Sequence, residues 1–195
     1  MFLKTPPESE TAARQYQNDV KDLGFVMNAS RLWAWRPETI EAFTAARVAL
    51  TKSSTLSKRE VGVLVCATAA SLGDSYCSLA WGKILAKSAD AATAAAVILD
   101  SPAAGMSARE QALSRWARKV VNDPNATRLE DVEALRAAGL SDQEIFDATT
   151  LVAFRLAFST VNDALGARPD PDLAAAVPPE VRAAVTFGRP VADSV

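Results

Sequence analysis

The stretch LGDSYCSLAWGKILA, residues 72–86, decides the fold of this chain. It follows a segment that opens Ser57-Lys-Arg-Glu60, a capping-box pattern that predicts the start of a helix. That helix is expected to run to about Leu72 and is apolar on nearly every face, which is typical of a buried central helix. Gly73-Asp74 then breaks the pattern, and Asp74 is a good N-cap for a second helix over residues 75–87. The sequence therefore predicts two consecutive helices joined by a tight turn.

Helical patterns cover the rest of the chain as far as residue 169, and no alternating strand pattern is convincing. Thr127 with Glu130 and Ser141 with Glu144 repeat the capping-box pattern. Further helices are predicted at residues 8–23, 30–35, 37–50, 90–99, 107–121, 127–138 and 142–165. We expect one all-α domain over residues 1–169. Residues 170–195 are expected to form an extended tail with one short helix at 180–185, which could contact a neighbouring subunit.

Composition excludes several classes of function. The 195 residues are 49% hydrophobic and carry a formal net charge of −2, so no basic field is present to attract nucleic acid or an anionic membrane. No run of apolar residues is long enough for a transmembrane helix, and the N-terminal residues do not resemble a signal peptide. The chain has two Cys and no His, which indicates a cytoplasmic protein without a metal site, a cofactor or an imidazole base.

The central block resembles the core of the alkylhydroperoxidase D-like / carboxymuconolactone decarboxylase family. Residues 27–32 with 37–43, residues 135–145 and residues 161–166 are similar to the family's entry segment, its connector and the end of its last long helix. The resemblance as a whole covers most of the chain and places it nearest to the peroxidase-related branch. The resemblance implies an all-α, alkylhydroperoxidase D-like helical bundle that assembles as a homo-oligomer. It does not by itself specify a reaction.

The motif that carries the family's peroxidase chemistry is degenerate in this chain. In those peroxidases a helix with a catalytic Glu leads into Cys-x-x-Cys-x-x-x-His; the second Cys attacks peroxide and the first resolves it. Here Cys77 matches the attacking Cys, Asp74 stands at the resolving position and Trp81 at the His. Gly62 falls where the Glu is expected. The resemblance therefore implies the scaffold, while these residues argue against the usual two-cysteine mechanism.

Cys77 is the first candidate catalytic residue. At the third position of its helix it lies near free amide groups and the positive end of the helix dipole, which favours thiolate. The Asp74 carboxylate one turn away opposes a second negative charge. A reactive thiol and a buried structural Cys are both consistent with this position.

Cys66 is the second candidate, because it follows Gly62 by four residues and shares its helix face. It could form a relocated redox pair with Cys77, provided that the two Cα atoms lie within about 7 Å. The alternative is a small core residue, since free Cys is among the most buried residue types.

Four further residues are candidates to line a pocket: Gly62, Asp74, Tyr76 and Trp81. Gly62 could leave space for Trp81 or for a ligand. Trp81 cannot transfer protons, but its ring could line an apolar pocket or fill the core. The Tyr76 hydroxyl could touch a ligand or make one buried hydrogen bond.

Three functions follow from these alternatives. The chain could be a peroxidase-like, antioxidant oxidoreductase that uses Cys77 as a single thiol, with Cys66 or an external thiol as its partner. It could instead bind or transform a small molecule without redox chemistry, or be a catalytically lapsed oligomeric member of the fold. Thiol reactivity distinguishes the first function, and an open cavity distinguishes the second from the third.

Overall fold

The computed structural model describes residues 1–103 and 105–193, which form eleven α-helices and one 3-10 turn without any β-strand. The helices are α1 (Glu10–Leu23), α2 (Asn28–Trp33), α3 (Pro37–Ser53), α4 (Lys58–Leu72), α5 (Ser75–Ser88), α6 (Ala91–Leu99), α7 (Ala108–Asn122), α8 (Leu129–Ala137), α9 (Asp142–Ala164), α10 (Pro171–Ala175) and α11 (Pro179–Ala184), and the 3-10 turn is Pro124–Ala126. The predicted all-α fold class is confirmed.

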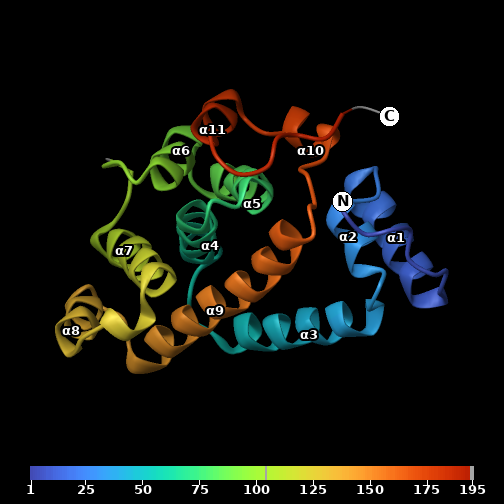
Figure 1. Ribbon diagram of the computed structural model, residues 1–195. Helices are drawn as coiled ribbons and strands as arrows, with labels where there is room; N and C mark the ends of the chain where they lie inside the picture. The colour runs from blue at the N-terminus through green and yellow to red at the C-terminus, as the bar shows by residue number, and fades with distance from the viewer. Residues whose placement is uncertain (104, 194–195) are drawn as a thin grey trace.

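Helix α4 lies at the centre of the bundle, with α5, α6, α7 and α9 packed around it (Figure 1). Its Val63, Leu64, Cys66 and Ala67 side chains have no exposed surface. An apolar pattern on all faces leaves such a helix no stable place except the core. The prediction of a buried central helix is confirmed.

Three capping boxes hold the N-termini of α4, α7 and α9 together. In each capping box, one carboxylate oxygen of the glutamate accepts a hydrogen bond from the N-cap amide. The second carboxylate oxygen pairs with an arginine of another helix. Arg109 pairs with Glu60 at 2.5 Å and with Glu144 at 2.6 Å. Arg59 pairs with Glu110 at 2.5 Å. Glu60 therefore has a structural role, as its place in the capping-box pattern predicts.

The capping box predicted from Thr127 and Glu130 is wrong. Helix α8 begins two residues later, and the Asp131 carboxylate accepts the hydrogen bond from the Arg128 amide at 2.8 Å. The Thr127 hydroxyl instead donates to the Pro124 carbonyl at 2.9 Å. The 3-10 turn at residues 124–126 uses the hydroxyl that the pattern assigned to the helix.

The C-terminal segment is not the extended tail that its prolines suggest. It forms α10 and α11, and α11 packs against α5 and α6 of the same chain (Figure 1). Val181 of α11 is fully buried, and a Cβ on Gly82 of α5 would lie only 2.5 Å from its Cγ1 atom. Proline at the first position of each short helix is compatible with helix initiation.

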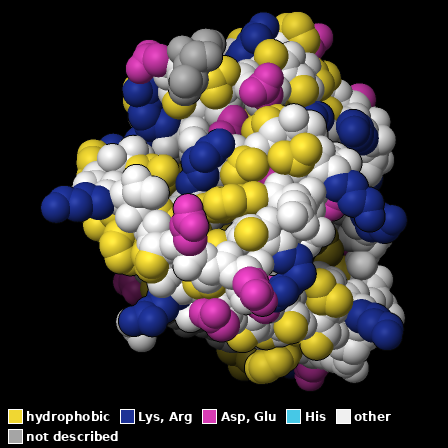
Figure 2. Space-filling model, turned by 90° about the vertical axis from the view of Figure 1, so that its right-hand side faces the viewer, with side chains coloured by type: hydrophobic (Ala, Val, Ile, Leu, Met, Phe, Trp, Pro, Cys, Tyr) yellow, Lys and Arg dark blue, Asp and Glu magenta, His cyan; other side chains and the backbone are white. Residues whose placement is uncertain are grey.

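Helices α1, α2 and α3 complete the molecule on the side where the chain begins, and α3 lies along α9 (Figure 1). On the face shown in Figure 2, basic and acidic side chains are interspersed among apolar ones rather than gathered by sign. No helix in the described part of the chain is both long enough and apolar enough to cross a bilayer.

Candidate functional site

The turn between α4 and α5 positions Cys77. Gly73 ends α4 in the left-handed conformation, with φ of 79°, and Asp74 caps α5. The Cys77 amide donates to the Asp74 Oδ1 atom at 2.9 Å. Cys77 is thus the third residue of its helix, as the sequence predicts, and its side chain is directed into the protein with only 2% of the residue exposed.

Two side chains of α9 donate to the Cys77 sulfur. Arg155 Nη1 lies 3.3 Å from Sγ, and the Ser159 hydroxyl oxygen lies 3.5 Å from it. Burial raises the pKa of Cys77 to about 12, and the Asp74 carboxylate adds to that increase. The charge of Arg155 and the Ser159 hydrogen bond act in the opposite direction and favour thiolate. Cys77 therefore rests as a neutral thiol, and the Arg155 and Ser159 donors beside it stabilise the thiolate.

Arg155 is an unusual residue for this position because it is only 9% exposed. Its guanidinium carbon lies 5.3 Å from the Trp81 ring centre and 5.2 Å from that of Phe158. Its Nε atom has no hydrogen-bond partner among the described residues, and no carboxylate among them pairs with its charge. Aromatic faces offset part of the cost of burying this cation, but they supply no counter-ion.

A small cavity of about 10 Å³ borders this site, between α3, α4, α5 and α9. Its lining includes the aromatic rings of Phe43, Trp81 and Phe154 and the guanidinium groups of Arg47 and Arg155. The volume suffices for about one water molecule. Arg155 lines the cavity and also contacts the thiol, so it connects the two.

Of the four predicted pocket residues, only Trp81 lines this cavity. Gly62 makes room for Leu85, whose Cδ1 atom would lie 3.2 Å from a Cβ at that position, and not for Trp81. Asp74 serves as the cap. The Tyr76 hydroxyl donates to the Asp170 carboxylate, a contact that ties α5 to the segment before α10.

Cys66 and Cys77 are both free, buried thiols. Burial raises the pKa of Cys66 far above its ordinary value. The Arg155 charge acts to lower it, and negative charge on Cys77 acts to raise it further. The charge of Arg155 therefore favours the thiolate of both cysteines, but only Cys77 has a hydrogen bond from it among the described residues.

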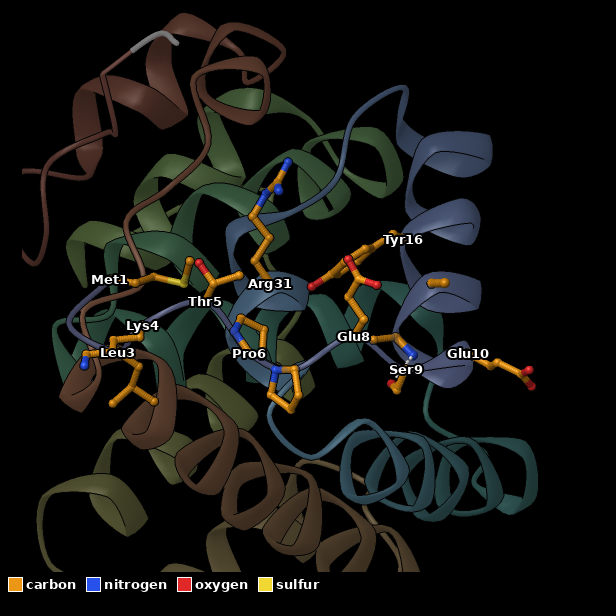
Figure 3. Close-up of a pocket in the computed structure, with 13 residues that line it drawn as sticks. Met1, Leu3, Lys4, Thr5, Pro6, Glu8, Ser9, Glu10, Tyr16 and Arg31 are labelled. Atoms are coloured by element: carbon orange, nitrogen blue, oxygen red, sulfur yellow. Dashed lines mark hydrogen bonds between the residues drawn. The ribbon is translucent and has the colours of Figure 1, made fainter.

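A larger hollow of about 940 Å³ lies elsewhere, beneath the extended N-terminal residues (Figure 3). Met1, residues 3–9, four residues of α1 and Arg31 line it, and none of the predicted site residues does. In the close-up, the Glu8 and Tyr16 side chains are drawn next to each other, and the Arg31 side chain extends away from both. It contains no thiol, and the described residues hold no cluster of three or more potential metal ligands anywhere.

Arg155 and Ser159 were not identified from the sequence. A signal exists, because Arg155 interrupts the otherwise apolar run LVAFRLAF, residues 151–158. A lone cation in the middle of a buried helix face requires a partner. Which partner it meets depends on the packing of α9 against α5, which sequence spacing does not reveal.

No family model matches the sequence, and no curated protein matches it significantly. Solved structures do match. An alkylhydroperoxidase AhpD core, an uncharacterized peroxidase-related protein from Ralstonia eutropha JMP134, is 27% identical with a TM-score of 0.78, over 88% of this chain and 93% of that one. An uncharacterized peroxidase-related protein from Silicibacter sp. TM1040 is 24% identical with a TM-score of 0.79, over the same shares.

The debrominase Bmp8 has the same fold. Its apo structure is 14% identical to this chain with a TM-score of 0.75, over 93% of this chain and 98% of that one. A cysteine-to-alanine variant of Bmp8 in complex with 2,3,4-tribromopyrrole matches with a TM-score of 0.73. The shared architecture shows that the chain has the alkylhydroperoxidase D-like fold, and its identity to the Ralstonia protein makes it similar to the peroxidase-related proteins of that fold.

Proposed function

We propose that the protein is a single-thiol, peroxidase-like oxidoreductase in which Cys77 attacks the peroxide. The observation that carries this proposal is the Arg155 guanidinium, buried 3.3 Å from the Cys77 sulfur without a carboxylate partner among the described residues. An unpaired buried cation is costly unless an anion forms beside it. The thiolate of Cys77 is the anion that this geometry can stabilise.

The chemistry requires one peroxide and two reducing equivalents. The Cys77 thiolate attacks one peroxide oxygen, the O–O bond breaks, and the leaving hydroxide takes up a proton to become water. Cys77 is then a sulfenic acid. A thiol attacks that sulfur, releases a second water and forms a disulfide, and a further thiol reduces the disulfide and restores Cys77.

The resolving thiol is either Cys66, the only other cysteine of the chain, or an external thiol. We favour an external thiol because Cys66 has no exposed surface and burial keeps it protonated. An external thiol also removes the need for Cα atoms close enough to form an internal disulfide. Asp74 lacks sulfur and cannot take this role.

Hydrogen peroxide treatment with intact-mass detection tests the proposal. The wild-type protein is expected to gain one oxygen, located on Cys77 by peptide mapping, and a small thiol should return the mass to its starting value. Cys77→Ser should abolish the gain, whereas Cys66→Ser should retain it. If the oxygen is found on methionine and never on Cys77, the proposal is wrong. A Cys66–Cys77 disulfide would instead identify Cys66 as the resolving thiol.

A further inference from the structure

Two arginines line the small cavity, and its lining includes no acidic residue. Arg47 of α3 and Arg155 of α9 both line it. Burial and then the charge of Arg155 lower the pKa of Arg47, so the positive charge of one arginine disfavours that of the other. Neither forms an ion pair with any described carboxylate.

Like charges in a partly buried, apolar setting destabilise the fold unless an anion is bound there. The thiol of Cys77 contacts Arg155 alone among the described arginines, so it does not neutralise Arg47. The site therefore has an excess of cationic donors. Arginine is the side chain best suited to hold a carboxylate through two parallel hydrogen bonds.

The remainder of the lining is apolar and aromatic. Phe43 and Phe154 lie against each other with ring centres 5.4 Å apart, and Trp81 lines the cavity beside Arg155. A hydrated inorganic anion gains little from such walls, whereas a flat apolar body attached to a carboxylate would pack against them.

We propose that the cleft between Arg47 and Arg155 binds a small aromatic carboxylate. The carboxylate group would pair with the two guanidinium groups, and the ring would pack against the aromatic side chains. This binding site does not depend on the reactivity of Cys77, so it goes beyond the peroxidase-like function proposed above.

The ligand enters when the Arg47 side chain rotates outward, and the Arg47 guanidinium then pairs with the carboxylate at the rim of the cavity. The free volume holds about one water, so the aromatic ring fits only after a side chain moves. Arg47 is half-buried at the rim, and its side chain makes no hydrogen bond or ion pair with any described residue. Its displacement therefore breaks no specific contact, and side-chain rearrangement at a binding site is common.

Isothermal titration calorimetry with benzoate tests the inference, with benzyl alcohol as the neutral counterpart and inorganic phosphate as an anion without an apolar body. Arg47→Gln removes one guanidinium from the half-buried rim. Lys52→Gln removes one positive charge from the exposed side of the same helix and is the matched control. Circular dichroism verifies that both variants are folded, and sedimentation reports their oligomeric state.

Benzoate is expected to bind the wild type and Lys52→Gln alike, and Arg47→Gln at least about tenfold more weakly, as the loss of a charged hydrogen bond implies. Benzyl alcohol and phosphate should bind more weakly than benzoate. Equal binding of benzoate and benzyl alcohol, or an unchanged affinity in Arg47→Gln, would overturn the inference. So would a change of oligomeric mass in Arg47→Gln without benzoate binding by the wild type, because a carboxylate of a second copy would then be the occupant.

Discussion

The Arg155 guanidinium donates to the Cys77 sulfur across 3.3 Å, although the two residues are 78 positions apart in the chain. The contact joins α5, which bears Cys77, to the long helix α9. It places a fixed positive charge beside the thiol in a chain that has no His. The charge substitutes for a proton-transfer group only in part, because it stabilises thiolate without accepting the thiol proton.

The Ser159 hydroxyl makes the longer of the two hydrogen bonds to the Cys77 sulfur, at 3.5 Å. Ser159→Ala is expected to slow alkylation of Cys77 by iodoacetamide several-fold at a fixed alkaline pH, because the hydroxyl hydrogen bond lowers the pKa of the thiol. Thr160→Ala changes the exposed neighbour on the same helix and should leave the rate unchanged. Equal rates in both variants would show that Ser159 does not stabilise the anion.

Because Arg109 pairs with Glu144, the free energy of unfolding depends on pH in the acid range. Hydrogen bonds from Arg109 and Thr55 hold the pKa of Glu144 at about 2, below its ordinary 4.5. A lowered carboxyl pKa contributes stability that is present above pH 4.5 and is lost as the pH falls toward 2. Glu144→Gln should therefore lower the free energy of unfolding at neutral pH by about 1–3 kcal/mol, and by progressively less below pH 4.5.

Urea unfolding across that pH range measures the effect of Glu144→Gln. Glu133→Gln, on the exposed side of α8, is the control and should change the stability by less than about 0.5 kcal/mol. If Glu144→Gln lowers the free energy of unfolding by the same amount from neutral pH to pH 2, the lowered pKa of Glu144 is not the cause of the loss.

The Tyr76–Asp170 hydrogen bond joins α5 to the C-terminal segment inside the core. Tyr76→Phe removes the donor and leaves a buried carboxylate oxygen with one partner fewer, at a cost of about 1–3 kcal/mol in the free energy of unfolding. Tyr16→Phe, at the rim of the open N-terminal hollow, should cost much less. Similar losses in both variants would mean that the hydrogen bond contributes no net stability.

Two buried glycines provide a test of the packing around α4 and α5. A Cβ at Gly82 would lie 2.5 Å from Val181 Cγ1, whereas one at Gly62 would lie 3.2 Å from the end of the Leu85 side chain. Gly82→Ala is expected to destabilise the protein by about 1–3 kcal/mol through overpacking. Gly62→Ala should fall within about 1 kcal/mol of the wild type, because alanine's higher helix propensity offsets the closer contact. Thermal unfolding of both variants distinguishes these outcomes, and a well-tolerated Gly82→Ala would show that α11 does not pack on α5.

The helices and most of their caps could be predicted because the signals are local. Ser57 with Glu60, Ser141 with Glu144, and Asp74 ahead of α5 each satisfy their own helix end within three residues. The pattern at Thr127 failed because another local acceptor, the Pro124 carbonyl, takes its hydroxyl.

The site was predictable only in part. The motif and helical phase identify Cys77, Cys66 and Trp81 as candidates, whereas Arg155 reaches the sulfur only through the packing of α9 against the helices around it. The folded-back C-terminal segment was missed for the same reason, since Val181 meets Gly82 across nearly 100 positions of chain. Long-range packing of this kind leaves no periodic signal in one sequence.

The most direct test of the central claim is the rate of Cys77 alkylation against pH in the wild type, Arg155→Lys and Arg155→Met, followed by peptide mass mapping. In the wild type the rate should still be rising at about pH 10, as a thiol pKa of about 12 requires. At that pH Arg155→Met should react at least about tenfold more slowly, and Arg155→Lys should retain most of the wild-type rate. An Arg155→Met protein that is folded and reacts as fast as the wild type, or faster, would contradict the claim that this guanidinium stabilises the Cys77 thiolate.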